Sequence, residues 1–218
     1  MVFGKIQYVN LLPFHVFMKR FTRSSQQSAS MQYYSGVPSH INKKFRARRV
    51  DAAFISSSSA KKYKNVNIGI IATKEVQSVL VIPHATDEND QESASSNVLA
   101  KLLHIKGKVI IGDKALKHAL QTTDYKDLAK EWQNKYKVPF VFALLCYHGE
   151  KKIYKEIEKK FLQKKVKIPS YLLQKAALQT GVSPRNILKY LELISYKLDK
   201  KAKKGLKKFY VLRARHAL

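Results

Sequence analysis

The chain has one cysteine, Cys146, in 218 residues. A single thiol cannot form a disulfide within the chain, and no CxxC or cysteine–histidine cluster offers a metal site. No apolar run reaches the roughly 18 residues of a membrane span. Lys5 and Asn10 interrupt the N-terminal region where a signal peptide would need its apolar stretch. We therefore expect a cytoplasmic protein with no membrane segment.

Common catalytic and nucleotide-binding motifs are missing as well. The chain contains no GxGxxG, no P-loop, no GxSxG and no HExxH, which argues against dinucleotide-binding, P-loop, α/β-hydrolase and zincin activities. Its seven histidines form no pair of ligands on an evident shared face, and His15 is expected to be a packed residue of the first helix. We expect neither a metal nor an organic cofactor.

Acidic residues are scarce and basic ones abundant, which gives a net charge of +27. Such a charge attracts polyanions, so a nucleic-acid-binding protein is one alternative. The lysines nevertheless follow helical patterns. In KKIYKEIEKKFLQKKVK, the apolar Ile153, Ile157 and Phe161 recur every four residues and lysines fill the other faces. This pattern indicates solvated helix faces, and we expect no specific nucleic-acid partner.

A second feature of the C-terminal part resembles a helix-turn-helix. In QKAALQTGVSPRNILKYL, Gly181 is placed to end one helix and Ser183 to cap the next, just before Pro184. Capping chemistry alone explains this spacing, because any antiparallel helix pair shows it. We therefore expect two helices here rather than a DNA reader.

Apolar patterning predicts an α/β protein with mainly parallel strands, followed by a helical layer. A polar loop is expected at residues 23–30 and an acidic boundary at residues 84–92. With 45% hydrophobic residues the chain can bury its own core. The expected strands are 3–9, 32–35, 51–55, 67–72, 78–82, 108–111 and 140–146. The expected helices are 38–48, 95–103, 113–120, 127–136, 151–165, 169–180, 184–198 and 200–214.

Three strand-to-helix junctions are rich in serine: SGVPS at 35–39, ISSSSA at 55–60 and SASSN at 93–97. In open α/β sheets a ligand sits beyond the carboxyl ends of the strands, where the next helix offers free N–H groups. Serines at these places can bind an anion. They can also do no more than cap helices, as serine does in any protein.

The motifs resemble, in order, those of the chorismate dehydratase family of the futalosine route to menaquinone. They are YVNLLPF (8–14), SGVPSHIN (35–42), VDAAFISS (50–57), QSV (77–79), the serine-rich 93–96, IGD (111–113), DLAKEW (127–132) and PFVFA (139–143). The resemblance implies a fold like that of type II periplasmic binding proteins, with two α/β lobes. Residues 1–80 and 147–218 would form lobe 1, and residues 81–146 a smaller lobe 2, reduced because only seven residues separate Leu103 from Ile111.

The implied reaction removes water from chorismate and gives 3-(1-carboxyvinyloxy)benzoate, with no cofactor. Asn10 would orient the reacting groups while the enolpyruvyl carboxylate of the substrate accepts the proton. Asp113 is the alternative acceptor, or simply a helix N-cap. The residues expected to bind the substrate carboxylates are Gly36, Pro38, Ser39, Ser56, Ser57, Ser78, Ser95, Ser96 and Gly112.

Two other functions fit the same fold. One is the sibling naphthoate synthase, although its SPCPND-type opening is replaced by VNLLPF, and the other is a small-anion binding protein. The sequence makes no prediction about oligomeric state.

Overall fold

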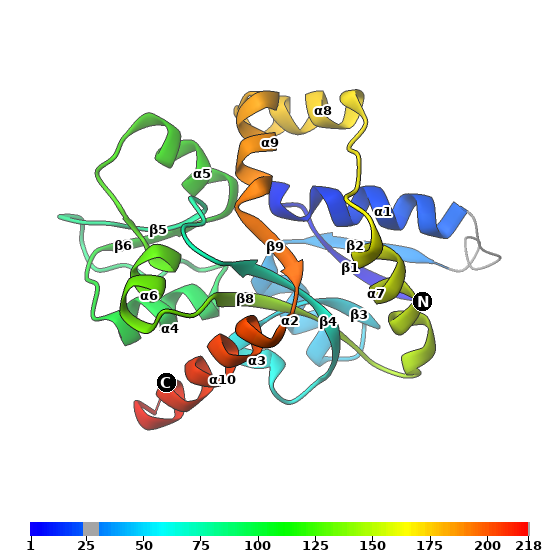
Figure 1. Ribbon diagram of the computed structural model, residues 1–218, viewed down its shortest axis with the longest axis horizontal. Helices are drawn as coiled ribbons and strands as arrows, with labels where there is room; N and C mark the ends of the chain where they lie inside the picture. Colours follow the sequence, from blue (N-terminus) through cyan, green and yellow to red (C-terminus); the bar gives the residue numbers. More distant parts are fainter. Residues whose placement is uncertain (24–30, 218) are drawn as a thin grey trace.

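Two β-sheets, a larger mixed one and a smaller antiparallel one, organise the molecule. A computed structural model describes residues 1–23 and 31–217, so the loop expected at 23–30 lies almost entirely outside the described residues (Figure 1). The larger sheet has the order β2-β1-β3-β8-β4-β9 and the smaller β6-β5-β7. The larger sheet consists of β1 (Val2–Ile6), β2 (Gln32–Gly36), β3 (Ala52–Ser56), β4 (Lys64–Ala72), β8 (Phe140–Tyr147) and β9 (Ile194–Lys197). The smaller consists of β5 (Val79–Ile82), β6 (Lys108–Ile111) and β7 (Lys126–Asp127).

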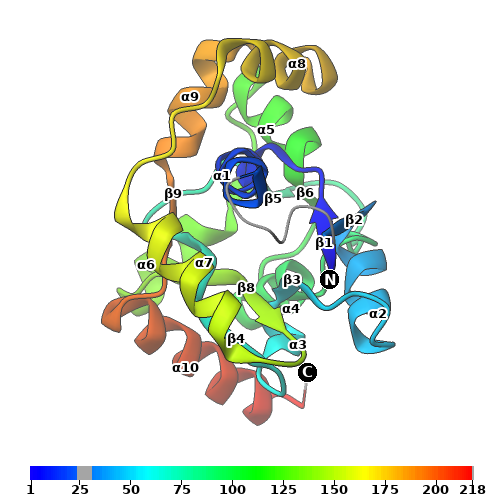
Figure 2. The ribbon, with the colours of Figure 1, turned by 90° about the vertical axis from the view of Figure 1, so that its right-hand side faces the viewer.

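Helices cover both sheets, and in Figures 1 and 2 α8 and α9 lie at one end of the molecule and α10 at the other. The short η1 (Val9–Leu11) leads into α1 (Leu12–Arg23). The other helices are α2 (Pro38–Arg46), α3 (Ser57–Ala60), α4 (Ala94–Leu103), α5 (Gly112–Gln121), α6 (Leu128–Tyr136), α7 (Lys151–Gln163), α8 (Ser170–Thr180), α9 (Pro184–Glu192) and α10 (Lys200–Arg215). None of the described helices is both long and apolar enough to span a membrane.

The prediction of mainly parallel strands is wrong. Among the described strands only β1 pairs in parallel, with β2 and β3, while the other strand pairings are antiparallel. The reason is the chain path. After β4 the chain leaves to build the smaller sheet, and it returns as β8 between β3 and β4, running opposite to both. Apolar runs show that a strand is buried but do not give its direction.

The helix expected at 184–198 is shorter than predicted. It ends at Glu192, and the next residues form β9, which pairs with β4. The segment Ile194–Lys197 contains the β-branched Ile194 and the aromatic Tyr196, and both residue types favour strands. Its apolar spacing fits a helix equally well, so the pattern alone does not predict the strand.

Aromatic side chains form much of the core. Phe14 on α1 packs edge-on against Phe54 of β3 and Phe161 of α7, with ring centroids 4.9 and 5.1 Å away. Ile157 and Phe161 are buried, while most of the lysines on α7 are exposed. The predicted solvated face of this helix is therefore confirmed.

Cys146 lies in the middle of the larger sheet. It belongs to β8 and is fully buried between β3 and β4. Burial raises the pKa of its thiol to about 12, because the charged thiolate is poorly solvated there.

The buried Asp127 fixes one of the two connections between the sheets. One carboxylate oxygen accepts the N–H groups of Val76 and Gln77, at 2.9 and 2.7 Å, in the crossover from β4 to β5. The other oxygen caps α6 by accepting the N–H groups of Ala129 and Lys130. One side chain thus ties the crossover to the start of a helix.

Candidate active site

A cavity lies between the two sheets, and both contribute residues to its wall. Six residues predicted from the sequence line it: Asn10, Pro38, Ser56, Ser78, Ser96 and Gly112. The cavity is also lined by residues for which the sequence predicted no role: Tyr8, Glu92, Ser93 and Phe142. Five predicted residues are not among those that line it: Gly36, Ser39, Ser57, Ser95 and Asp113.

Asn10 is held by its backbone, and its side chain lines the cavity. It follows β1 in η1, where its carbonyl accepts the Tyr196 hydroxyl at 2.6 Å. The preceding Val9 N–H donates to the Asp113 carboxylate at 3.0 Å. The Asn10 Oδ1 atom is buried and accepts no hydrogen bond from the described part of the chain. Because an unpaired buried acceptor is costly, this atom is suited to meet a ligand.

Ser78 is held from three directions. Its hydroxyl accepts the Tyr190 hydroxyl at 2.8 Å, and its carbonyl accepts the Gly112 N–H at 2.8 Å. The preceding Gln77 has a positive φ of 56°, which is uncommon for a residue with a side chain. The Gln77 N–H is one of the two N–H groups of this crossover that donate to Asp127. Strained backbone of this kind persists only where surrounding contacts fix it, and it often marks functional sites.

Gly112 must be glycine for two reasons. Its φ is +69°, and a Cβ atom built on it would lie 2.6 Å from the ring of Tyr8. The tyrosine ring thus lies directly against the start of α5. This close approach explains the glycine of the IGD motif.

The serines at 56–58 and 95 form a buried cluster. The Ser56 hydroxyl lies 2.6 Å from that of Ser95 and 3.0 Å from that of Ser58. Ser95 also accepts the Ser58 N–H at 2.9 Å, so it supports Ser56 from behind. Ser57 instead donates to the Val141 carbonyl at 2.6 Å and is fully buried. Its hydroxyl therefore serves the strand packing in this structure.

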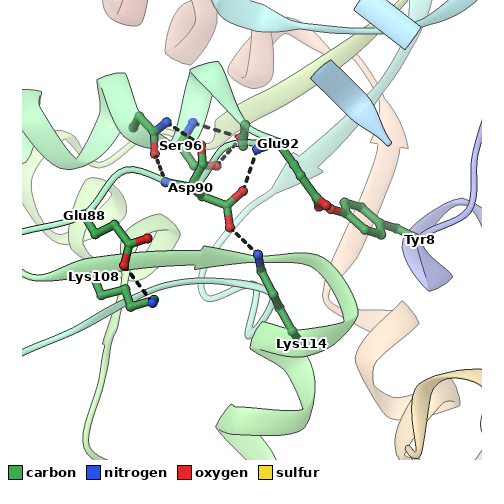
Figure 3. A network of polar contacts seen from close by, with 9 residues as sticks. Tyr8, Glu88, Asp90, Glu92, Ser96, Lys108 and Lys114 are labelled. Carbon is green, nitrogen blue, oxygen red and sulfur yellow. Dashed lines mark hydrogen bonds and ion pairs between the residues drawn. The ribbon is translucent and has the colours of Figure 1, made fainter. Parts of the chain in front are cut away.

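Residues 90–97, which we call the serine segment, bond mainly to one another. Ser93 caps α4 by accepting the Ser96 N–H, and the two hydroxyls lie 2.7 Å apart. Asn97 exchanges two hydrogen bonds with the backbone of Asp90, at 2.9 and 2.8 Å. The Asp90 carboxylate accepts the Glu92 N–H and binds Lys114 of α5 at 2.7 Å (Figure 3).

Glu92 connects this segment to the other side of the cavity. Figure 3 shows Tyr8 and Glu92 reaching toward each other, and the tyrosine hydroxyl donates to the Glu92 Oε2 atom. Burial, and then the neighbouring Glu92, raise the pKa of Tyr8 far above its usual value. In the sequence, Glu92 ends the acidic stretch 84–92, which predicts a loop and no functional role. Its position directly before SASSN is the signal that could have marked it.

The cavity wall is mainly apolar, and the described residues that line it carry no positive charge. None of the described residues that line it is lysine or arginine, and its side-chain donors are hydroxyls and the Asn10 amide. The helices α4 and α5 both begin at it, with Ser93, Ser96 and Gly112. The N–H groups of Ser96 and Gly112 already donate to Ser93 and Ser78, so the hydroxyls and the Asn10 amide are the groups that can bind a carboxylate by direct hydrogen bonds.

The other predicted residues lie near the cavity. Gly36 ends β2, and Ser39 is in the first turn of α2. Asp113 is in the first turn of α5 but does not cap it, because its carboxylate turns to Val9. Burial raises the pKa of Asp113. Within residues 1–23 and 31–217, no group of three or more His, Cys, Asp or Glu could hold a metal ion.

Comparisons with known proteins give both a family and a fold. The family model described as menaquinone biosynthesis matches residues 1–107 and 103–215. A chorismate dehydratase from Campylobacter jejuni is 47% identical over 213 residues, covering 96% of each chain.

Solved structures share the architecture at low identity. A protein from Archaeoglobus fulgidus has a TM-score of 0.72 and 12% identity, covering 99% of this chain and 97% of its own. The periplasmic aliphatic sulphonate binding protein from Escherichia coli has a TM-score of 0.59 and 12% identity, covering 100% and 92%. The predicted α/β fold of the periplasmic-binding-protein type is confirmed.

Proposed function

The chain belongs to the menaquinone biosynthesis family, as its ordered motifs predict, and from this premise we propose that it is a chorismate dehydratase. It is a hydro-lyase that converts chorismate to 3-(1-carboxyvinyloxy)benzoate and water, in the cytoplasm and without a metal or organic cofactor. The observation that carries the proposal is the 47% identity to the Campylobacter jejuni chorismate dehydratase across nearly the whole of both chains.

The reaction places a specific demand on the protein. The hydrogen on ring carbon C3 and the hydroxyl on C4 both leave, and the ring becomes aromatic, so the driving force is large. Free chorismate can also rearrange or lose its enolpyruvyl arm. The site must therefore hold both carboxylates and fix that arm while the hydroxyl departs. The hydroxyls of Ser56, Ser78 and Ser96 are suitable donors for the carboxylates.

We assign Asn10 as the catalytic residue that orients the reacting groups. An amide is no base at neutral pH, so the enolpyruvyl carboxylate of the substrate accepts the proton from C3 in this mechanism. The unpartnered Oδ1 atom of Asn10 and the fixed backbone of its turn support this role. Asp113 is the alternative acceptor. Its bond to Val9 favours a supporting role, because it holds the turn that carries Asn10.

The two sheets suggest two lobes that close on the substrate. The proposed division is residues 1–80 and 147–218 against residues 81–146, with the cavity between them. By pairing, β8 belongs with the larger sheet and β5 with the smaller. These two strands therefore shift the lobe boundaries from 80/81 and 146/147 to residues 73–78 and 137–139, which are the segments where a closing motion would bend.

One assay tests the activity. Purified protein is incubated with chorismate, and the product is identified by mass and by the ultraviolet spectrum of the new aromatic ring. Product should form equally well after dialysis against a chelator. Binding of chorismate without product would indicate a small-anion binding protein. The absence of both would reject the assignment.

A further inference from the structure

Glu92 is the one carboxylate among the described residues that line the cavity. Its Oε2 atom accepts the Tyr8 hydroxyl, and its N–H donates to Asp90 at 2.8 Å. Its Oε1 atom accepts no hydrogen bond from residues 1–23 or 31–217. A carboxylate oxygen thus stands in the wall of a site proposed to take an anion with two carboxylates, and no lysine or arginine of that wall neutralises it.

The hydrogen-bonding groups of the substrate decide what Glu92 can bind. An ionised carboxylate only accepts hydrogen bonds, and it repels other carboxylates. Chorismate at neutral pH carries two carboxylates, an ether oxygen and a single donor, which is the hydroxyl on C4. The hydroxyl is therefore the one polar group of the substrate that Glu92 can bind favourably.

We propose that Glu92 is a further catalytic residue, which accepts a hydrogen bond from the C4 hydroxyl and orients this leaving group. The proposal rests on the proposed function. In the reaction the C3–H bond breaks, and its electron pair becomes the new ring double bond while the C4–O bond breaks toward oxygen. The proton from C3 passes by way of the substrate carboxylate to the departing oxygen, which leaves as water. Glu92 ends the turnover unchanged.

The surroundings of Glu92 hold it in place for this role. Asp90, whose side chain is 1% exposed, binds the Glu92 N–H and Lys114, while Asn97 fixes the Asp90 backbone (Figure 3). Tyr8 occupies one carboxylate oxygen and leaves the other for a ligand. A group held in this way is oriented before the substrate arrives, which lowers the cost of binding.

The reaction product provides the test, because it keeps both carboxylates and the enolpyruvyl arm but has lost the hydroxyl. Rapid-mixing measurements made before turnover give the affinities of the parent and Glu92→Gln proteins for chorismate, and calorimetry gives their affinities for 3-(1-carboxyvinyloxy)benzoate. A neutral amide is a weaker acceptor than a carboxylate, so Glu92→Gln should bind chorismate about 10-fold more weakly. Product binding should stay the same or tighten, because a like charge is removed.

Two further variants complete the experiment. Glu88→Gln removes an exposed carboxylate that pairs with Lys108 outside the cavity, and should bind both compounds like the parent. Tyr8→Phe keeps the Glu92 carboxylate, and should retain the parental preference for chorismate over product within about 3-fold.

The ratio of the two affinities decides the outcome. A parental ratio in Glu92→Gln, or equal weakening of both compounds, would overturn the proposal, since either result makes Glu92 a structural residue. If Glu92→Gln does not fold, loss of the preference in Tyr8→Phe would overturn it instead. A parent protein that neither binds nor converts chorismate would reject the proposed function itself, which is a different result.

Discussion

Asn10 and Ser78 are each held by a tyrosine from the C-terminal part of the chain, whereas the serine segment is held mostly by itself. The Tyr196 and Tyr190 hydroxyls reach back 186 and 112 positions. The side-chain bonds within the serine segment join residues no more than seven positions apart. One half of the site therefore depends on how the C-terminal elements return to the sheet. The other half combines local bonds with contacts to Tyr8, Ser56 and Lys114.

The largest expected effect concerns the half held at long range. Asn10→Ala should lower turnover by at least about 100-fold while chorismate binding changes little, because the amide is proposed to act in the transition state. Steady-state kinetics with direct calorimetric binding would check this. Asn65→Ala, at an exposed position on β4, is the matched control. Near-parental turnover of Asn10→Ala would end its catalytic assignment.

The next effect tests the tyrosines themselves. Tyr190→Phe and Tyr196→Phe each remove one buried hydroxyl that positions a residue of the cavity, and each should lower kcat/KM by about 10-fold. Tyr171→Phe should match the parent, because this side chain is exposed on α8. If both buried variants also behave like the parent, the long-range contacts only stabilise the fold, and the contrast between the two halves is structural alone.

A smaller effect separates two serines that the sequence treats alike. Ser95→Ala removes the support of Ser56 and should weaken chorismate binding by about 3- to 10-fold. Ser57→Ala breaks the bond to Val141 and should reduce the free energy of unfolding by about 1 kcal/mol, with the affinity unchanged. Calorimetry and thermal melts distinguish the two outcomes. A large loss of chorismate affinity in Ser57→Ala would instead show that Ser57 belongs to the binding site.

The smallest expected effect is a dependence of stability on pH. It concerns the half of the site that contains Asn10. His15 on α1 bonds the Ile6 carbonyl at 2.8 Å, and burial lowers its pKa to about 4. The neutral ring is favoured in the folded state, so its contribution is complete above pH 6.5 and is lost as pH falls from 6.5 toward 4. Between pH 7 and pH 6 the parent should lose about 0.7 kcal/mol more stability than His15→Gln. Equal slopes for the two proteins would contradict the pKa.

Much of the site was predictable because its motifs are local. A serine before a helix start is recognisable from a few residues, and the caps expected at Gly181 and Ser183 are both present. The glycine of IGD is required by its own backbone angle. These features need no knowledge of the rest of the fold.

The remaining part depends on which segments meet in space. Nothing near Ser78 indicates that a tyrosine in α9 binds it, and nothing near Tyr8 indicates a glutamate 84 positions later. The antiparallel return of β8 and the strand β9 were missed for the same reason, since both follow from the chain path rather than from local pattern. The contact between Ser57 and Val141 shows that a serine in a motif can turn into the core instead of toward a ligand.

Because Cys146 is buried, its chemical modification can report when the larger sheet opens. Only the thiolate reacts with alkylating reagents, and a thiol with a pKa near 12 inside the larger sheet is both unionised and covered. Labelling should therefore proceed only in molecules whose β3, β4 and β8 have separated. Because this is the one cysteine of the chain, its rate of modification measures the free energy of that opening without any engineered probe.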